Sequence, residues 1–453
     1  MTDIFNQLRS AVPGVVWPVL PDQPGATALA LQHQLDQSQW WSPADLQLHQ
    51  LAQLRLVLRH AIETVPYWGA RLGKEWRRDD IIPDWTRFRQ LPLMTRADAQ
   101  QSGNDLLSRR IPGDHGALTR SGSSGSTGMP LTCYGTALTD FFWRAFTLRE
   151  HFWHGRDFSG RLAAIRLKVN SGEMPGWGPA TDIAFTTGPC ALLNLQTDID
   201  TQLDWLEAQS AQYLITIATN LRWLAERAIE RKLKLPGLLE ARSYGGIVDD
   251  KTRDAVDAAW QVKVVDMYTA QEVGYIALQC PLHAHYHVQS ENLIVEILDG
   301  SGAPCPPGDV GRVVVTTLHN FAMPLIRYEI GDFAEAGDAC ECGRGLPVLR
   351  RIMGRERNLL RLPDGRRHWP SFPQSRWVAI APIRQLQLVQ KSLQDIRVRI
   401  VAPRDLSADE AQRLIAVLQD CLGYPFRMTV ERVDEIARAG NYKFEDFVSE
   451  CAD

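Results

Sequence analysis

The sequence predicts an α/β fold, in which a large multi-subdomain N-terminal part with mixed sheets and helices precedes a small α+β C-terminal domain. Three observations support this prediction. The chain has 453 residues, more than one hydrophobic core usually accommodates. Its hydrophobic and charged fractions, 45% and 23%, are typical of globular proteins. From residue 138 onward, segments with helical spacing of apolar residues alternate with short apolar segments typical of strands.

The first half of the chain begins with a predicted amphipathic helix over residues 43–75, which ends in a turn that contains proline. Thr95 or Asp98 is expected near the start of a second, capped helix. The elements that follow are an extended segment at 130–134, a helix at 138–155, buried strands at 161–167 and 213–218, and an amphipathic helix at 220–235.

The second half is richer in predicted strands, joined by glycine and proline turns. These strand-rich segments cover residues 261–270, 287–299, 311–319 and 324–336. The pattern then restarts with strands in 384–403, a helix at 407–423 and a final strand at 426–434. This strand–helix–strand tail predicts the small α+β domain.

Composition and charge exclude several classes of function. The formal net charge of −4 gives no reason to expect a nucleic acid or an anionic membrane as partner. The N-terminal stretch MTDIFNQLRS has no features of a secretory signal, and no apolar run approaches the roughly 18 residues of a membrane span. Eight cysteines in a chain of this length predict reduced thiols. We expect a cytoplasmic protein that is a monomer or a homodimer.

A stretch rich in glycine and hydroxyl residues, RSGSSGSTGMP, covers residues 120–130. It does not match the phosphate loop of nucleotide kinases, because Gly122 and Gly128 are one position too far apart and Met129-Pro130 replaces the required Lys and hydroxyl. Its composition fits a flexible segment or a loop that offers N–H and hydroxyl groups to a polyphosphate. Both interpretations remain open on composition alone.

Seven stretches, in order and over nearly the whole chain, resemble motifs of the adenylate-forming enzymes, in particular the phenylacetate–CoA ligase and CapK-like branch. They are LRLVLRHAIETVPYWGARL (54–72), LPLMTRADAQ (91–100), SGSSGSTGMP (121–130), DMYTAQEVG (266–274), MPLIRYEIGD (323–332), IMGRERN (352–358) and RAGNYKFEDF (438–447).

The resemblance implies an N-terminal adenylation domain, residues 1–355, that binds ATP and a carboxylic acid. Residues 356–453 would form a small mobile domain that carries Lys443. The implied reaction converts an acid, expected to be aromatic, to acyl-AMP with release of pyrophosphate. Coenzyme A then takes the acyl group and AMP leaves. One alternative is a different acceptor, such as an acyl carrier protein, an amine or a cofactor. A second alternative is a non-catalytic nucleotide-binding protein on the same fold.

Three residues are implied to be catalytic by the resemblance. Joining a carboxylate to the α-phosphate of ATP brings two anions together, so positive charge must gather at the forming bond. Lys443 would supply a flexible ammonium there, and Thr269 would lie near the α-phosphate. Glu272 would hold Mg²⁺, a hard ion that prefers carboxylate oxygen; a solvated turn carboxylate is the alternative interpretation of Glu272.

The resemblance also implies a set of nucleotide-binding residues. Asp332 would accept hydrogen bonds from the ribose hydroxyls, with Arg355 near the ribose or phosphate. The hinge position falls on Arg357, where the family usually has Asp or Lys, so the sequence departs from the family pattern there. The other expected nucleotide contacts are Ser123, Ser124, Gly125, Ser126, Thr127, Gly128, Gly245, Gly246 and Tyr268.

The acid should bind beside the phosphate loop and the glycine turn. The aromatic side chains Tyr134, Phe141, Phe142 and Tyr244 are the candidates, and they would suit an aryl or arylacetic acid. The alternative interpretation is that Phe141 and Phe142 belong to the core of a helix.

Two clusters of soft metal ligands lie about sixty residues apart. CPLHAHYH contains Cys280, His283, His285 and His287, and CECG contains Cys340 and Cys342. Such ligands form tetrahedral zinc sites, and a site with four protein ligands is structural. The branch resemblance favours Cys280, His287, Cys340 and Cys342, without deciding which histidine binds. Reduced cysteines and surface histidines are the alternative interpretation.

Overall fold

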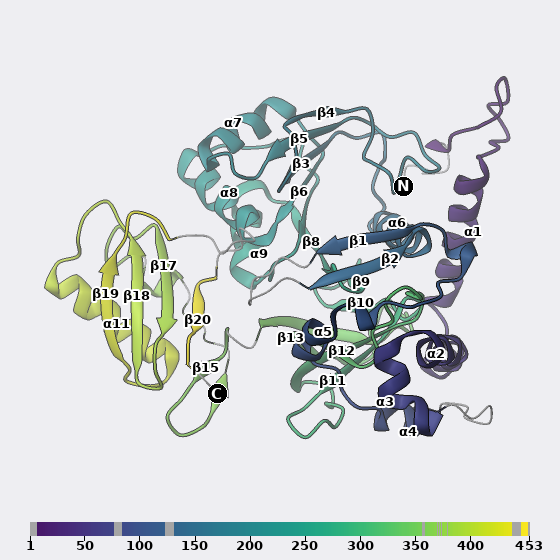
Figure 1. The fold of residues 1–453 in the computed structure, drawn as a ribbon. Helices are drawn as coiled ribbons and strands as arrows, with labels where there is room; N and C mark the ends of the chain where they lie inside the picture. The colour runs from purple at the N-terminus through teal and green to yellow at the C-terminus, as the bar shows by residue number, and fades with distance from the viewer. Residues whose placement is uncertain are drawn as a thin grey trace. The chain divides into compact units, whose positions relative to one another are not determined.

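The computed structural model describes residues 7–76, 84–122, 131–355, 358–368, 370, 372, 374–377, 379–436 and 445–451 (Figure 1). The chain divides into two compact units. The large unit contains most of the chain up to residue 352, and the small unit contains the chain from residue 353 together with residues 331–333. Within the described residues, no helix combines the length and the hydropathy needed to cross a bilayer.

Helices dominate the first part of the chain. They are α1 (Gln23–Ser38), α2 (Pro43–Thr64), α3 (Pro66–Trp76), α4 (Trp85–Gln90) and α5 (Arg96–Ser102), followed by the 3-10 helices Gly103–Leu106 and Gly113–His115. The single helix expected at 43–75 is two helices. Val65 is extended (φ −105°, ψ 113°) because it precedes Pro66, whose ring disfavours the helical conformation of the residue before it.

A twelve-stranded mixed sheet, in the order β11-β12-β13-β14-β10-β9-β8-β7-β6-β3-β5-β4, runs through the large unit among the described residues. Its strands are β3 (Leu162–Arg166), β4 (Gly172–Met174), β5 (Cys190–Asn194), β6 (Tyr213–Ile217), β7 (Glu240–Tyr244), β8 (Lys263–Ala270), β9 (Gly274–Gln279), β10 (Tyr286–Val288), β11 (Leu293–Leu298), β12 (Val310–Thr317), β13 (Tyr328–Ala336) and β14 (Val348–Arg355). A separate hairpin pairs β1 (Leu118–Gly122) with β2 (Thr132–Thr136).

Strands β5, β3, β6, β7 and β8 are parallel, and one helix connects each of the pairs β5–β6, β6–β7 and β7–β8. These helices are α7 (Ile199–Gln209), α8 (Ala218–Arg231) and α9 (Asp250–Trp260), while α6 (Ala137–Trp153) precedes β3 (Figure 1). The carboxyl ends of parallel strands meet at one edge of a sheet, which is where α/β proteins bind ligands.

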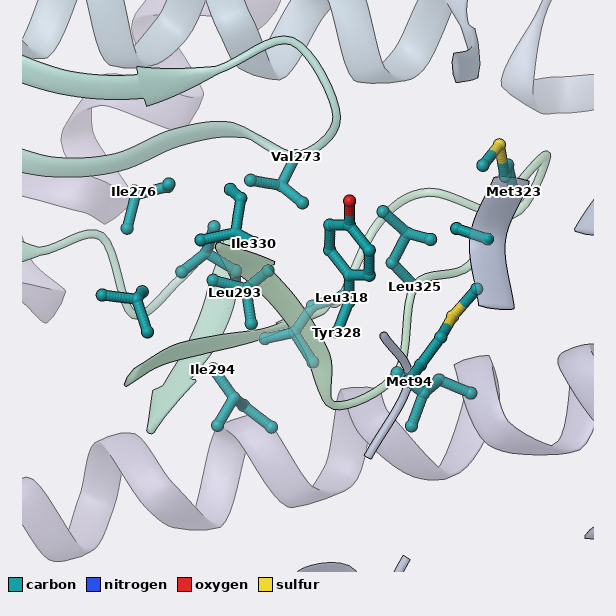
Figure 2. Packing of buried hydrophobic residues seen from close by; sticks show 14 of the residues in the cluster. Met94, Val273, Ile276, Leu293, Ile294, Leu318, Met323, Leu325, Tyr328 and Ile330 are labelled. Atoms are coloured by element: carbon teal, nitrogen blue, oxygen red, sulfur yellow. The ribbon is translucent and has the colours of Figure 1, made fainter. Parts of the chain in front are cut away.

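The antiparallel half of the sheet surrounds a core of buried apolar side chains. Figure 2 shows Tyr328, which is fully buried, among Leu325, Leu318 and Ile330. Met94 joins this core, and its backbone exchanges hydrogen bonds of 2.9 Å with Arg327 and Glu329 on either side of Tyr328. The start of α5 is therefore fixed against β13.

The small unit is an α+β structure, as the sequence predicts. Its elements are β15 (Leu360–Arg361), β16 (Arg367–His368), α10 (Gln374–Trp377), β17 (Gln385–Gln390), β18 (Asp395–Val401), α11 (Ala408–Leu422), β19 (Arg427–Arg432) and β20 (Phe447–Ser449). Strand β20 was not expected, and it pairs in parallel with β17 at the edge of a four-stranded sheet. Ser407 and Glu410 cap α11 reciprocally, and Gly423 ends it in the left-handed conformation.

A buried ion network joins α6 to the parallel strands. Glu150 on α6 accepts hydrogen bonds from Arg156 and Arg242, and Arg156 also donates to Glu240 at 2.6 Å. All four side chains are at most 4% exposed. Burial opposes ionisation of Glu150, but the two guanidinium groups outweigh it and hold the pKa of the carboxyl well below its usual range. The network fixes α6 against β7.

We predict that Glu150→Ala lowers the free energy of unfolding by about 3–5 kcal/mol, because it removes the buried carboxylate that pairs with Arg242 and leaves Arg156 with Glu240 alone. Asp200→Ala is the control, since Asp200 is an exposed partner of Arg227 and Arg231 and its loss should cost less than about 1 kcal/mol. Chemical denaturation of both variants measures the difference. Equal and small losses would contradict the structural role given to the network.

Candidate functional site

The glycine turn after β7 lies close to the start of α8. Gly245 has φ +67°, a left-handed conformation that glycine adopts without steric cost. A Cβ atom on Gly246 would lie 3.0 Å from the Cβ atom of Ala218, so a larger residue would push the two segments apart. Both glycines thus allow a close approach of backbone at the carboxyl ends of β6 and β7.

The next strand brings Tyr268 and Thr269 to the same edge of the sheet. Strands β7 and β8 pair in parallel, with Tyr244 opposite Met267. The pairing of β8 with β9 shifts register between Tyr268 and Thr269. Tyr268 is buried and Thr269 is partly exposed. The expected nucleotide contacts on the glycine turn and on β8 therefore lie on neighbouring strands.

Glu272 occupies the turn between β8 and β9 and is 9% exposed. Its Oε1 atom lies 3.1 Å from Nη1 of Arg96, the first residue of α5. The Thr95–Asp98 capping box fixes the start of that helix. Arg96 was not among the expected site residues, because 176 positions separate it from Glu272 in the sequence.

Among the described residues, the second carboxylate oxygen of Glu272 has no hydrogen-bond or ion-pair partner. Within the described residues, the contacts of Glu272 involve Oε1 alone, and Oε2 is not among the buried atoms that lack a partner. A buried carboxylate with one oxygen paired and one oxygen accessible suits a divalent cation, which prefers charged oxygen ligands.

A pocket of about 290 Å³ opens beside Glu272. Its walls come from the β1–β2 hairpin, the first turns of α6, the β8–β9 turn and the segments that follow β10 and β12. The lining residues are Thr119, Arg120, Ser121, Cys133, Tyr134, Gly135, Thr139, Asp140, Phe142, Trp143, Gln271, Glu272, Val273, Gly274, Tyr275, Asn292, Thr317, His319 and Asn320.

Tyr134 and Phe142, two of the four aromatic candidates for the acid site, line this pocket. Phe141 and Tyr244 do not line it. The Phe141 ring lies 6.5 Å from that of Phe142 at 73°, and Tyr244 lies under the guanidinium of Arg166 at 5.5 Å. The aromatic side chains of Trp143 and Tyr275, which also line the pocket, were not expected there, because they belong to none of the seven motifs.

Asp332 on β13 and Arg355 at the end of β14 lie together. Arg355 Nε is 3.4 Å from Asp332 Oδ1, and both side chains are partly exposed. Gly331, with φ +86°, precedes Asp332. The two residues expected at the ribose are thus paired in the structure.

Several expected site residues lie outside the described part of the chain. They are Ser123, Ser124, Gly125, Ser126, Thr127, Gly128, Lys443 and the hinge residue Arg357. The described hairpin strands end at Gly122 and resume at Thr132, which face each other in the β1–β2 register. The expected phosphate loop therefore connects two paired strands.

The cysteine and histidine clusters meet in space. The ligand atoms of Cys280, His285, His287 and Cys340 all lie within 4.8 Å of one another. The Cys280 and Cys340 sulfur atoms are 3.9 Å apart, and His285 Nε2 is 3.0 Å from the Cys340 sulfur. Cys342 also reaches the group, with its sulfur 3.3 Å from His287 Nε2. His283 is not part of the group but stacks on His285 at 5.1 Å.

The His287 ring is oriented as a metal ligand requires. Its Nδ1 lies 3.4 Å from the carbonyl oxygen of Leu346, which can only accept, so Nδ1 carries the proton. Burial lowers the pKa of His287 to about 4, so the ring is neutral and Nε2 has a free lone pair facing the thiols. The contact with the Leu346 carbonyl could not be inferred from the sequence, because 59 positions separate the two residues.

No family model matches the chain. Among curated proteins, it is similar to the phenylacetate-coenzyme A ligase of Thermus thermophilus, with 29% identity over 172 residues, 36% of each chain. The phenylacetate-coenzyme A ligases of Aromatoleum evansii and Pseudomonas putida are 22% and 23% identical to it. These two alignments cover 70% and 72% of this chain and 72% and 74% of the relatives.

Solved structures of similar fold include two kinds of CoA ligase. A 2-hydroxyisobutyryl-CoA ligase in the postadenylation state has a TM-score of 0.71 at 18% identity, over 92% of both chains. An anthranilate CoA ligase in complex with anthranoyl-AMP has a TM-score of 0.54 at 16% identity, over 72% of this chain and 64% of that one. The fold is that of the adenylate-forming enzymes.

Proposed function

We propose that this chain, a phenylacetate–CoA ligase-like member of the adenylate-forming enzymes, activates an aromatic carboxylic acid with ATP and transfers the acyl group to coenzyme A. Two related phenylacetate–CoA ligases align over 70% or more of the chain, and CoA ligases share its fold. The observation that carries the proposal is the buried Glu272 carboxylate, paired with Arg96 through one oxygen, beside a pocket with aromatic walls.

In the first half-reaction the acid carboxylate attacks the α-phosphate of ATP, and pyrophosphate leaves with the electron pair of the broken P–O bond. Glu272 would hold Mg²⁺, which neutralises phosphate charge when bound. Thr269 would contact the α-phosphate, and Lys443 would bring an ammonium to the forming bond. Arg96 fixes the Glu272 carboxylate in place through its ion pair.

The nucleoside would bind at the carboxyl ends of β7 and β8. Gly246 approaches Ala218 closely, so the glycine turn presents backbone without a side chain at the start of α8. The base would lie against this backbone, with Tyr268 beside it. Asp332 would accept hydrogen bonds from the ribose hydroxyls. Its ion pair with Arg355 already orients the carboxylate. Ser123, Ser124, Gly125, Ser126, Thr127 and Gly128 would enclose the β- and γ-phosphates.

In the second half-reaction the thiol of coenzyme A attacks the acyl carbonyl, loses its proton, and AMP leaves with the electron pair of the acyl–O bond. Lys443 would leave the site before the thiol enters. The resemblance implies this through a movement of the small domain, residues 356–453.

ATP–pyrophosphate exchange with a panel of aromatic acids tests the activation step. We expect exchange that depends on both Mg²⁺ and an acid, because the acyl-AMP step is reversible. Exchange should be fastest with aryl or arylacetic acids. Absence of exchange with every acid, together with absence of ATP binding, would overturn the proposal.

Glu272→Gln should lower the rate of pyrophosphate exchange about 100-fold or more, because the amide keeps the size of the side chain but loses the charge that holds the cation. The Mg²⁺ concentration needed for half-maximal rate should rise as well. Glu230→Gln, on the exposed face of α8, serves as the control and should leave both quantities unchanged. An unchanged Mg²⁺ dependence in Glu272→Gln would remove this residue from the site.

The Cys–His cluster would bind a structural zinc ion. A tetrahedral zinc site with thiolate ligands places neighbouring sulfur atoms about 3.8 Å apart, and Cys280 and Cys340 are 3.9 Å apart. Cys280, Cys340 and His287 supply three ligands, and Cys342 or His285 supplies the fourth. The ion would tie the end of β9 and β10 to the loop before β14.

Purified protein should contain about one zinc ion per chain by elemental analysis. Single changes of Cys280, Cys340 or His287 should remove it, because three ligands hold zinc far more weakly than four. Either Cys342→Ser or His285→Gln should also lose zinc. The variant that loses it identifies the fourth ligand. Cys305→Ser is the control and should keep the ion. Less than a tenth of an equivalent in the unaltered protein would contradict the zinc site.

A further inference from the structure

His319 lies two residues beyond the end of β12, in the wall of the pocket beside Glu272. Its ring stacks face to face on Phe142 of α6, with ring centroids 4.1 Å apart and an angle of 8° between the planes. The side chain is partly buried. The pair forms a flat element in the pocket wall, contributed by two segments far apart in the sequence.

The hydrogen bond of His319 fixes where its proton lies. Nε2 is 2.8 Å from the backbone carbonyl oxygen of Glu291. A carbonyl oxygen can only accept, so Nε2 carries the hydrogen. Burial lowers the pKa of His319, and the charge of nearby His115 acts in the same direction, while the carbonyl opposes both. The ring is therefore neutral, and Nδ1 has a lone pair and no hydrogen.

Within the described residues, the contacts of His319 are the stack on Phe142 and the bond to Glu291, so Nδ1 has no protein partner. Nδ1 is also absent from the fully buried atoms that lack a partner, so among the described residues it keeps some exposure, and His319 lines the pocket. Asn292 supplies a second acceptor to the same pocket. Its Nδ2 donates to the carbonyl of Tyr275 at 3.1 Å, and its Oδ1 has no partner among the described residues.

We propose that the pocket selects planar aromatic acids that carry a hydroxyl or amino group, and that this group donates a hydrogen bond to Nδ1 of His319. The inference rests on the proposed acid activation and names the substrate class of the same site. The flat Phe142–His319 pair sets the orientation of the substrate ring, and the bare Nδ1 selects for the donor.

The energetic basis is the cost of an unmade hydrogen bond. An unsubstituted acid that fills the pocket excludes water from Nδ1 and leaves the acceptor unpaired, whereas a hydroxyl or amino substituent satisfies it. Sites built around such an acceptor reject ligands that lack the donor more strongly than apolar pockets discriminate by size. A methyl ether keeps the oxygen but has no hydrogen to donate.

The first test uses the unaltered protein. Benzoate and phenylacetate are compared with their hydroxy, amino and methoxy derivatives at each ring position, by kcat/KM in ATP–pyrophosphate exchange. For at least one ring position, the hydroxy or amino acid should exceed both the unsubstituted and the methoxy acid by tenfold or more. Equal values for hydroxy and methoxy acids at every position would overturn the inference while acid activation itself stands.

The second test uses His319→Phe, which keeps a flat ring against Phe142 but removes the acceptor. We expect kcat/KM for the preferred hydroxy or amino acid to fall tenfold or more and that for the unsubstituted acid to change less than threefold. His33→Phe, at an exposed position of α1, is the matched control and should change neither value. A loss of the same size for every acid would show that His319 only supports the pocket wall and would overturn the inference.

The two tests remain separable from the proposed function and from folding. If no acid supports exchange, the activation proposal fails, and the selectivity inference fails with it. If His319→Phe does not fold, the ring-position series on the unaltered protein still decides the inference, because a missing preference for the donor overturns it and a tenfold preference supports it.

Discussion

The buried ion pairs of Glu150 hold the large unit in the arrangement on which the candidate site depends. Glu150 lies near the carboxyl end of α6 and binds Arg242, in the middle of β7. The other end of α6 contributes Phe142 to the pocket, and β7 leads directly into the glycine turn at Gly245. The buried carboxylate of Glu150 therefore links α6, which forms part of the pocket wall, to β7, which ends at the expected nucleotide site.

The neighbouring residue on α6 extends this constraint to the opposite wall. Arg149 is buried and forms an ion pair of 3.0 Å with Glu291, which also accepts a hydrogen bond from Ser38 of α1. The backbone carbonyl of the same Glu291 fixes the proton of His319. Two neighbouring charged residues of α6 therefore support the stacked rings. Glu150 fixes the helix that carries Phe142, and Arg149 fixes Glu291, whose carbonyl binds His319. Rigid support of this kind keeps an acceptor aimed at a ligand before the ligand binds.

The sequence predicted those parts of the fold and site that local pattern determines. Periodicity placed α11 and the strands around it, and the strand pattern placed Glu272 just after one strand and Asp332 within another, as the structure has them. It did not predict the pairing of β20 with β17, because three residues are too short for a pattern. Arg96 and His319 were also missed, since each acquires its role from a contact with a residue distant in the sequence.

Product analysis by mass spectrometry tests whether the protein adenylates an acid and passes the acyl group to coenzyme A. The protein is incubated with ATP, Mg²⁺, coenzyme A and a mixture of aromatic acids. We expect AMP, pyrophosphate and the coenzyme A thioester of one or a few of these acids. Formation of ADP, or of AMP with no acyl product from any acid, would contradict it.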